Sequence, residues 1–133
     1  MQNSSCGFEE VDAAYVRAHL GKVILLDVRS VGEYTGRQQM GEARPGHIPG
    51  AVLLPILSLF NEDGSVHPER EVEAAFEAAG LSDRDAEIIV YCAMGYRAKL
   101  AAQVMAERGF SNLKVYTASY FDWAADPANP VEL

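Results

Sequence analysis

Short apolar runs alternate with helix-forming segments along the chain. Four runs are rich in valine, isoleucine, leucine and other apolar side chains, which is typical of strands that helices cover on both faces. The segments between them place apolar residues at helical spacing, and several end at a glycine. This alternation predicts an α/β fold with a parallel sheet. We expect strands over residues 23–26, 51–54, 87–91 and 113–116, helices over 9–20, 56–60, 69–79 and 97–108, and helical turns over 30–34 and 119–125.

A long polar stretch, residues 35–50, interrupts this pattern. It contains glycine, proline and charges of both signs, and loops of this length in a compact domain are functional or mobile. Arg37 and Arg44 lie in it, and two interpretations stay open for both: contact with an anionic substrate, or solvated surface charge. His47, with its glycine and proline neighbours, favours a structural turn.

The composition is that of one globular domain, which we place at residues 8–133 after a flexible leader of residues 1–7. The formal net charge of −8 argues against a nucleic-acid partner, although an acidic protein can still be positive within one site. The sequence begins without a basic and apolar signal segment, and no apolar run approaches the ~18 residues of a membrane span. We therefore expect no membrane partner and a cytoplasmic protein.

Cysteine usage directs attention to one residue. The two cysteines, Cys6 and Cys92, are too few for a disulfide framework or a thiolate zinc site, and neither His47 nor His67 stands at a ligand spacing. We expect no metal and no cofactor. Cys6 lies in the leader, and its role stays open.

Cys92 stands between the strand that ends at residue 91 and the helix that begins at residue 97. A parallel sheet binds ligands at the carboxyl ends of its strands, and a helix N-terminus favours an anion. The same surroundings favour the reactive thiolate form of a cysteine. Free cysteines are often no more than core packing, but this placement favours a nucleophile.

Charged residues near this position have assignable roles. A cation such as Arg97 in the first turn of a helix opposes the helix dipole, so we expect it to hold the loop or to contact an anionic substrate. Asp27 and Arg29 follow the strand over residues 23–26 and open onto the same edge of the sheet. We expect them to form a structural ion pair, with Arg29 close enough to influence the pocket.

Four short motifs follow one another along the chain: Asp27-Val28-Arg29, Glu33-Tyr34, Gly46-His47-Ile48-Pro49-Gly50-Ala51 and Cys92-Ala93-Met94-Gly95-Tyr96-Arg97. In this order and spacing they resemble the motifs of the rhodanese domain. The resemblance covers residues 11–132, and segments 116–123 and 126–132 are similar to the end of the catalytic C-terminal domain of thiosulfate and mercaptopyruvate sulfurtransferases. It implies a rhodanese fold, with a five-stranded parallel sheet and helices on both faces.

The resemblance also implies a function. Cys92 would accept a sulfane sulfur as a persulfide, and a thiol, cyanide or a protein acceptor would then remove it. The backbone of the loop after Cys92 would wrap around that sulfur, and Trp123 would line the pocket. The loop residues are Ala93, Met94, Gly95, Tyr96 and Arg97.

The loop departs from both donor-specific patterns of the family. Members that use thiosulfate tend to carry basic residues where this chain has Ala93 and Met94, and members that use mercaptopyruvate tend to carry Cys-Gly-Ser-Gly. Members of both groups often have an arginine at the position of Glu33. Thiosulfate, mercaptopyruvate and a persulfide therefore all stay open as small-molecule donors.

Two other functions compete with sulfur transfer by an independent enzyme. A sulfur-carrier or regulatory module on the same fold would work with a protein partner. Phosphatases and arsenate reductases of the related fold have Cys-x5-Arg loops, whereas four residues separate Cys92 from Arg97 here. The shorter loop suits one sulfur atom better than a phosphate.

Overall fold

Five parallel strands form one sheet in the computed structural model, which describes residues 7–133. The predicted leader therefore lies, except for Gly7, outside the described residues, as does Cys6. The strands are β1 (Glu9–Val11), β2 (Ile24–Asp27), β3 (Val52–Leu53), β4 (Ile88–Tyr91) and β5 (Leu113–Tyr116); the helices are α1 (Ala13–His19), α2 (Val31–Thr35), the 3-10 turn η2 (Ile56–Ser58), α3 (Glu69–Ala78), α4 (Tyr96–Glu107) and α5 (Ser119–Ala125).

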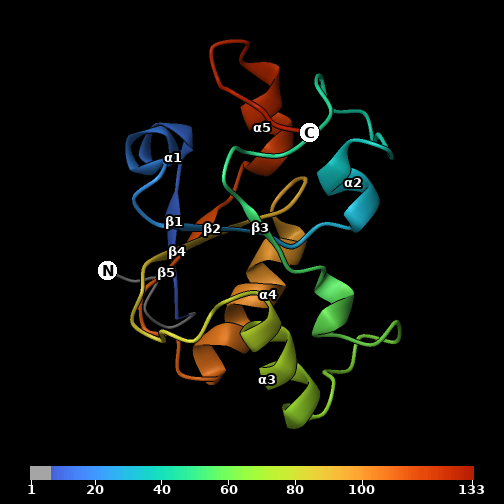
Figure 1. Ribbon diagram of the computed structural model, residues 1–133, viewed down its shortest axis with the longest axis vertical. Coiled ribbons are helices and arrows are strands. Elements are labelled where there is room, and N and C mark those ends of the chain that lie inside the picture. The colour runs from blue at the N-terminus through green and yellow to red at the C-terminus, as the bar shows by residue number, and fades with distance from the viewer. Residues whose placement is uncertain (1–6) are drawn as a thin grey trace.

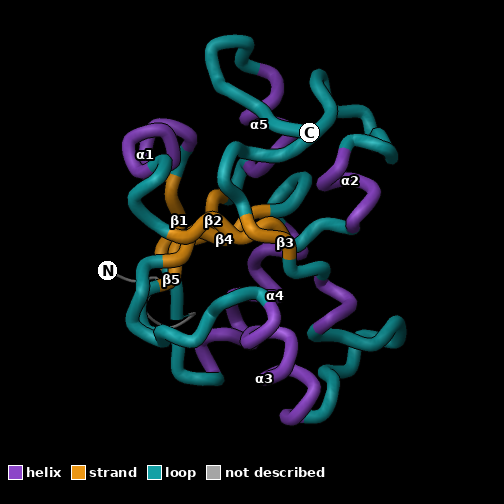
Figure 2. Tube along the Cα trace, viewed as in Figure 1, coloured by secondary structure: helices purple, strands orange, loops and turns teal. Residues whose placement is uncertain are grey.

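The strand order across the sheet is β1-β5-β4-β2-β3, and all four pairings are parallel (Figure 1). Helices α1 and α5 cover one face, and α3 and α4 cover the other (Figure 2). The predicted α/β class, with a five-stranded parallel sheet and helices on both faces, is confirmed. All strands end at one edge, which places the segments after β2, β3 and β4 close together.

Alternate side chains of β4 serve two separate cores. Ile88 and Val90 belong to the apolar cluster that includes α3 and α4, whereas Ile89 and Tyr91 belong to the cluster that includes α1 and α5. Burial on both faces explains why β4 is apolar at every position. Cys92 continues the alternation and lies in the cluster with α3 and α4.

The helix predicted over residues 9–20 is wrong at its beginning. Glu9–Val11 forms edge strand β1, which pairs with Lys114–Tyr116 of β5. Asp12 then caps α1, and its carboxylate accepts the N–H of Tyr15 at 3.0 Å. Apolar spacing alone included Val11 in the helix, because pairing with a strand a hundred residues away leaves no local signal.

The other predicted elements agree with the structure within two residues at each boundary. The strand expected over residues 51–54 is reduced to Val52–Leu53, and the helix expected over residues 97–108 runs from Tyr96 to Glu107. Within residues 7–133, no helix is long and apolar enough to cross a bilayer.

The polar stretch over residues 35–50 is anchored to the end of the chain. Arg44 donates hydrogen bonds of 2.8–3.0 Å to three backbone carbonyls at the end of α5 and just beyond it. The backbone groups of His47 and Glu132 exchange two hydrogen bonds, of 2.7 and 2.8 Å. At Gly46 a Cβ atom would lie 2.2 Å from the carbonyl oxygen of Glu132, so the close approach requires glycine. These contacts place the long loop firmly over the edge of the sheet.

Candidate active site

A tight turn joins β4 to α4 and carries the thiol of Cys92. Gly95 makes this turn with a φ of +103°, in the region that favours glycine. A Cβ atom on Gly95 would lie 2.3 Å from the carbonyl oxygen of Thr117, beyond the end of β5. The turn is therefore packed against the neighbouring strand's extension and requires glycine for two independent reasons.

The sulfur of Cys92 accepts two backbone hydrogen bonds. The N–H groups of Gly95 and Ala98 point at Sγ, with N···S distances of 3.1 and 3.3 Å. Gly95 is the N-cap of α4 and has no side chain, so the sulfur takes the position that a capping oxygen normally fills. Because these donors lie at a helix N-terminus, they favour negative charge on the sulfur.

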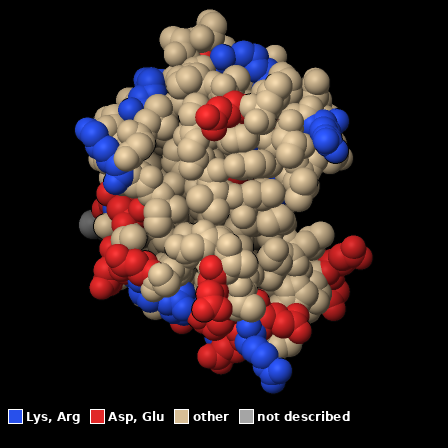
Figure 3. Space-filling view, in the orientation of Figure 1, with Lys and Arg blue, Asp and Glu red and all other residues tan. Residues whose placement is uncertain are grey.

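The side chain of Cys92 is buried at 1% exposure, yet the loop around it reaches the surface. Met94 and Tyr96 are 72% and 75% exposed, whereas Ala93, which precedes Met94, and Gly95, which lies between the two, are buried. In Figure 3 the surface is indented at the edge where the strands end, between the segments that carry α2 and η2. The buried thiol therefore belongs to a loop with two large, uncharged and exposed side chains, which together are called the rim.

The start of α5 fixes the backbone of the same loop. The N–H groups of Tyr120 and Phe121 donate to the carbonyls of Cys92 and Ala93, at 2.9 and 3.1 Å. Ser119 accepts the N–H of Cys92 through Oγ at 3.1 Å and donates to the carbonyl of Tyr116 at 2.8 Å. These bonds hold the loop carbonyls away from the sulfur, so that N–H groups face it.

Ser119 is a site residue that the sequence analysis did not identify. Its φ of +61° is the single left-handed value at a non-glycine residue within the described part of the chain. Its Oγ lies 4.0 Å from the sulfur of Cys92. The one signal in the sequence is a hydroxyl residue three positions after β5, at the edge of the sheet, where the pattern predicts only the start of a helical turn.

Arg97 forms a bidentate ion pair with Glu33. Its two terminal nitrogens lie 2.9 and 3.0 Å from the two carboxylate oxygens. Glu33 also accepts the N–H of Ser30, the residue that caps α2, and its side chain is only 4% exposed. The pair therefore ties the end of the thiol loop to the beginning of α2. Of the two roles expected for Arg97, the observed contact is the one that holds the loop.

The ion pair perturbs both of its members. Burial raises the pKa of Glu33, but the hydrogen bonds from Arg97 and Ser30 and the charge of Arg97 outweigh it and lower the pKa to about 2. The hydrogen bonds to Glu33 raise the pKa of Arg97 and outweigh burial, which lowers it. The charges of Glu33 and Cys92 raise it further. Glu33 belongs to one of the four motifs, but nothing in the sequence pattern pairs it with Arg97.

The pair expected between Asp27 and Arg29 is present at the end of β2. The guanidinium donates to both carboxylate oxygens at 2.7–3.1 Å and to the carbonyl of Gly46 at 2.7 Å. Both side chains are buried, and Arg29 lies over the ring of Tyr120 at 4.3 Å from its centroid. Burial disfavours the charge of Arg29, but Asp27 outweighs it and raises the pKa of the guanidinium.

The other predicted pocket residues lie elsewhere. Arg37 is exposed near the end of α2, and Arg44 is held by the backbone carbonyls described above. His47 stacks on Tyr34 with ring centroids 3.8 Å apart, in the structural turn that was expected. Trp123 is fully buried, donates to the carbonyl of Pro130, and belongs to the core on the opposite face of the sheet from Cys92. The structure thus does not bring Trp123 to the thiol.

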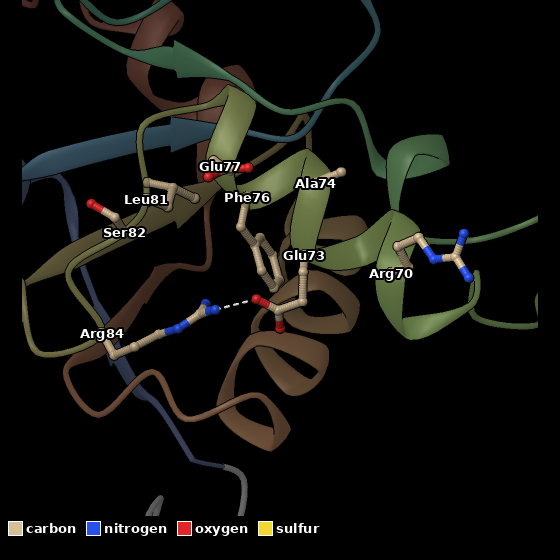
Figure 4. A pocket seen from close by; sticks show the side chains of 8 residues that line it. All are labelled: Arg70, Glu73, Ala74, Phe76, Glu77, Leu81, Ser82 and Arg84. Carbon is tan, nitrogen blue, oxygen red and sulfur yellow. Dashed lines mark hydrogen bonds and ion pairs between the residues drawn. The ribbon is translucent and has the colours of Figure 1, made fainter.

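A pocket of about 420 Å³ lies at the other edge of the sheet, between α3 and the segment that leads into β4 (Figure 4). Arg84 forms an ion pair with Glu73 there and lies over the ring of Phe110, 4.3 Å from its centroid. The ion pair connects α3 to the loop before β4. Because α/β sheets bind ligands at the carboxyl ends of their strands, the loop of Cys92 is the stronger candidate site.

The fold and this loop define an α/β protein with a cysteine cradled at a helix N-terminus. The family model described as Rhodanese-like domain matches residues 11–126, and the chain belongs to this family. The chain is 36% identical over 126 residues to a Mycolicibacterium smegmatis protein named "Putative thiosulfate sulfurtransferase", a match that covers 89% of this chain and 45% of that protein.

Two further similarities are informative. The chain is 34% identical over 116 residues to "Sulfur carrier protein TtuD" of Thermus thermophilus, covering 81% of this chain and 40% of that protein. A crystal structure of the anaerobic ergothioneine biosynthesis enzyme from Chlorobium limicola, in complex with trimethyl histidine, matches 92% of this chain and 31% of its own, with a TM-score of 0.79 and 26% identity. The chain spans less than half the length of these proteins.

Proposed function

We propose that this chain is a sulfurtransferase that carries a sulfane sulfur on Cys92. The observation that carries the proposal is the cradle: a buried sulfur that accepts N–H groups from Gly95 and Ala98 at the N-terminus of α4. This arrangement stabilises a thiolate and, after transfer, a persulfide. Membership of the rhodanese-like family and the similarity to the Mycolicibacterium protein support the same chemistry.

The reaction has two displacement steps. The thiolate of Cys92 attacks the transferable sulfur of the donor, a new S–S bond forms, and the donor's bond to that sulfur breaks, with its electron pair leaving on the rest of the donor. From thiosulfate the leaving group is sulfite, and from an organic persulfide it is a thiolate. A thiol or cyanide then attacks the outer sulfur of the Cys92 persulfide and releases the thiolate. The two steps need no cofactor and no external oxidant or reductant.

Intact-mass measurement tests the proposal directly. The protein is incubated with thiosulfate, mercaptopyruvate or a low-molecular-weight persulfide, and we expect a gain of one sulfur atom that is lost when thiol or cyanide is added. Cys92→Ser should gain no sulfur while keeping its thermal unfolding transition. Cys6→Ser is the matched control and should still take up sulfur. Uptake by Cys92→Ser equal to that of the unmodified chain would exclude Cys92 as the carrier.

A second candidate is a sulfur carrier that delivers to a protein partner. The exposed apolar side chains of Met94 and Tyr96 beside the thiol favour it, because a protein partner can cover them. The similarity to a protein named as a sulfur carrier points the same way. In this case transfer from the loaded chain to cyanide would be slow, and transfer to a protein acceptor would be fast.

A phosphatase is disfavoured by the position of Arg97. Loops of that class use the arginine to hold phosphate oxygens. Here both terminal nitrogens of Arg97 already donate to the carboxylate of Glu33. A reducing compartment such as the cytoplasm is part of the proposal, because the thiol of Cys92 has to stay free for the reaction.

A further inference from the structure

Two arginines at the carboxyl edge of the sheet are each neutralised by a carboxylate. Arg97 closes the loop and is held by Glu33 in a bidentate pair. Arg29 follows β2 and is held by Asp27, with both side chains buried. Arg97 is the one charged residue in the segment from Cys92 to Arg97. Glu33 therefore compensates the one cation that the thiol loop itself carries.

We propose that Glu33 is a specificity-determining residue that directs the site toward organic persulfides and away from thiosulfate. This inference rests on the proposed function. Thiosulfate carries two negative charges and has to approach a thiolate, so its transition state gathers negative charge that a free arginine would stabilise. An organic persulfide adds at most one charge, on the sulfur that the cradle itself receives. Glu33 removes the advantage that Arg97 would give to the more highly charged donor.

The rim of the site agrees with an organic donor. Met94 and Tyr96 are the exposed residues of the loop, and neither carries a charge. Ala93 adds a further uncharged, buried position directly after Cys92. A carbon-bearing donor can pack on this rim, whereas the sulfonate end of thiosulfate finds no charge on it.

The transfer step balances without another reactant. The thiolate of Cys92 attacks the terminal sulfur of R–S–SH, the new Sγ–S bond forms, and the R–S to S bond breaks. The electron pair of that bond leaves on R–S⁻, which takes the proton of the persulfide, and Cys92 keeps the terminal sulfur.

Glu33→Gln tests the inference, because glutamine keeps an oxygen that can accept from Ser30 and Arg97 but lacks the negative charge. Single-turnover rates of sulfur loading are measured by intact mass, with thiosulfate in one arm and 2-hydroxyethyl persulfide, whose carbon chain carries no charge, in the other. A charged cleft raises association rates for an oppositely charged substrate by roughly 10–1000-fold, and we expect the ratio of thiosulfate to persulfide rates to rise about tenfold. High salt should erase the gain.

Two further variants separate Glu33 from a general change in charge. Glu10→Gln removes a carboxylate from the same edge of the sheet, where Glu10 pairs with Lys99 rather than Arg97, and should leave the ratio unchanged. The double variant Glu33→Gln/Arg97→Gln should lose the gain, because the freed charge is then absent. A gain that persists in the double variant would overturn the role of Arg97.

The unmodified protein gives a test that does not depend on how a variant folds. With Arg97 compensated and a net charge of −8, its loading by thiosulfate should not slow as ionic strength rises. A clear fall in rate with salt would mean that a free cation attracts the donor, and would overturn the inference. If neither donor loads the unmodified protein, the proposed function itself fails; if thiosulfate loads it as fast as the persulfide, only the specificity inference fails.

Discussion

The ion pair between Glu33 and Arg97 should stabilise the fold in a pH-dependent way. Its carboxylate has an ordinary pKa of 4.5, which is lowered to about 2 in the folded protein. Because the folded pKa is the lower one, the stabilisation is complete above the unfolded pKa and is lost as pH falls through the folded pKa. The window therefore runs from about pH 5 down to about pH 2.

The size of the effect follows from the two pKa values. Each pH unit between them corresponds to 1.36 kcal/mol, which gives about 3 kcal/mol at pH 7 and about 1 kcal/mol at pH 3. Arg97 is 31% exposed, so water screens the pair and reduces the effect. We therefore expect Glu33 to contribute about 1–2 kcal/mol at neutral pH, with more than half of that lost at pH 3.

Urea unfolding of the unmodified protein and of Glu33→Gln measures this contribution. Trp123, the sole tryptophan and fully buried, provides the fluorescence signal. The difference in unfolding free energy between the two proteins isolates Glu33, because the other carboxylates titrate in both. We expect the difference to be largest at pH 7 and to shrink toward pH 3. A difference of equal size at both pH values would refute the reasoning, since the ion pair would then not depend on the charge of Glu33.

Two further predictions concern the loop itself. Gly95→Ala should destabilise the protein by about 2–4 kcal/mol in urea unfolding and reduce sulfur loading, because φ is positive there and the new Cβ would meet the carbonyl of Thr117. Gly80 also has a positive φ, but a Cβ on it would meet nothing, so Gly80→Ala should cost only about 1 kcal/mol. Equal losses at the two glycines would contradict the clash. Ser119→Ala leaves the N–H of Cys92 without its acceptor, so it should lower the free energy of unfolding by about 1–3 kcal/mol and slow sulfur loading in the mass assay. Unchanged stability and an unchanged loading rate would contradict the role of Ser119 in holding the loop.

The fold could be predicted from the sequence wherever local patterns decide it. Four strands were found because each is a short run rich in apolar residues, and β4, which is buried at every position, is apolar throughout. Strand β1 was missed because its three residues are stabilised by the edge of β5, and the polar pair Glu9-Glu10 carries no strand pattern of its own. The position of Cys92 was predictable since strand, turn and helix follow one another within the same segment.

The partners of the site residues were not predictable in the same way. Glu33 and Arg97 are separated by 64 positions, and Cys92 and Ser119 by 27. The strand order brings the segments after β2 and β5 to either side of β4, so both could be expected near the thiol. Which side chain then meets which depends on the rotation of α2 and on the left-handed backbone of Ser119, and neither follows from apolar spacing.

The contacts from α5 and from Glu33 explain how the loop can hold a sulfur atom while its one charged side chain, Arg97, is held in an ion pair. The start of α5 takes the carbonyls of Cys92 and Ala93, so the loop turns its N–H groups toward the sulfur. Arg97 is anchored on α2, so the end of the loop is fixed without placing a free cation beside the thiol. Charge on the sulfur is then met by backbone dipoles, which are neutral overall and do not attract anions from a distance as a free arginine would. A cradle of this kind can stabilise a thiolate and a persulfide and still discriminate against a donor that carries a second negative charge.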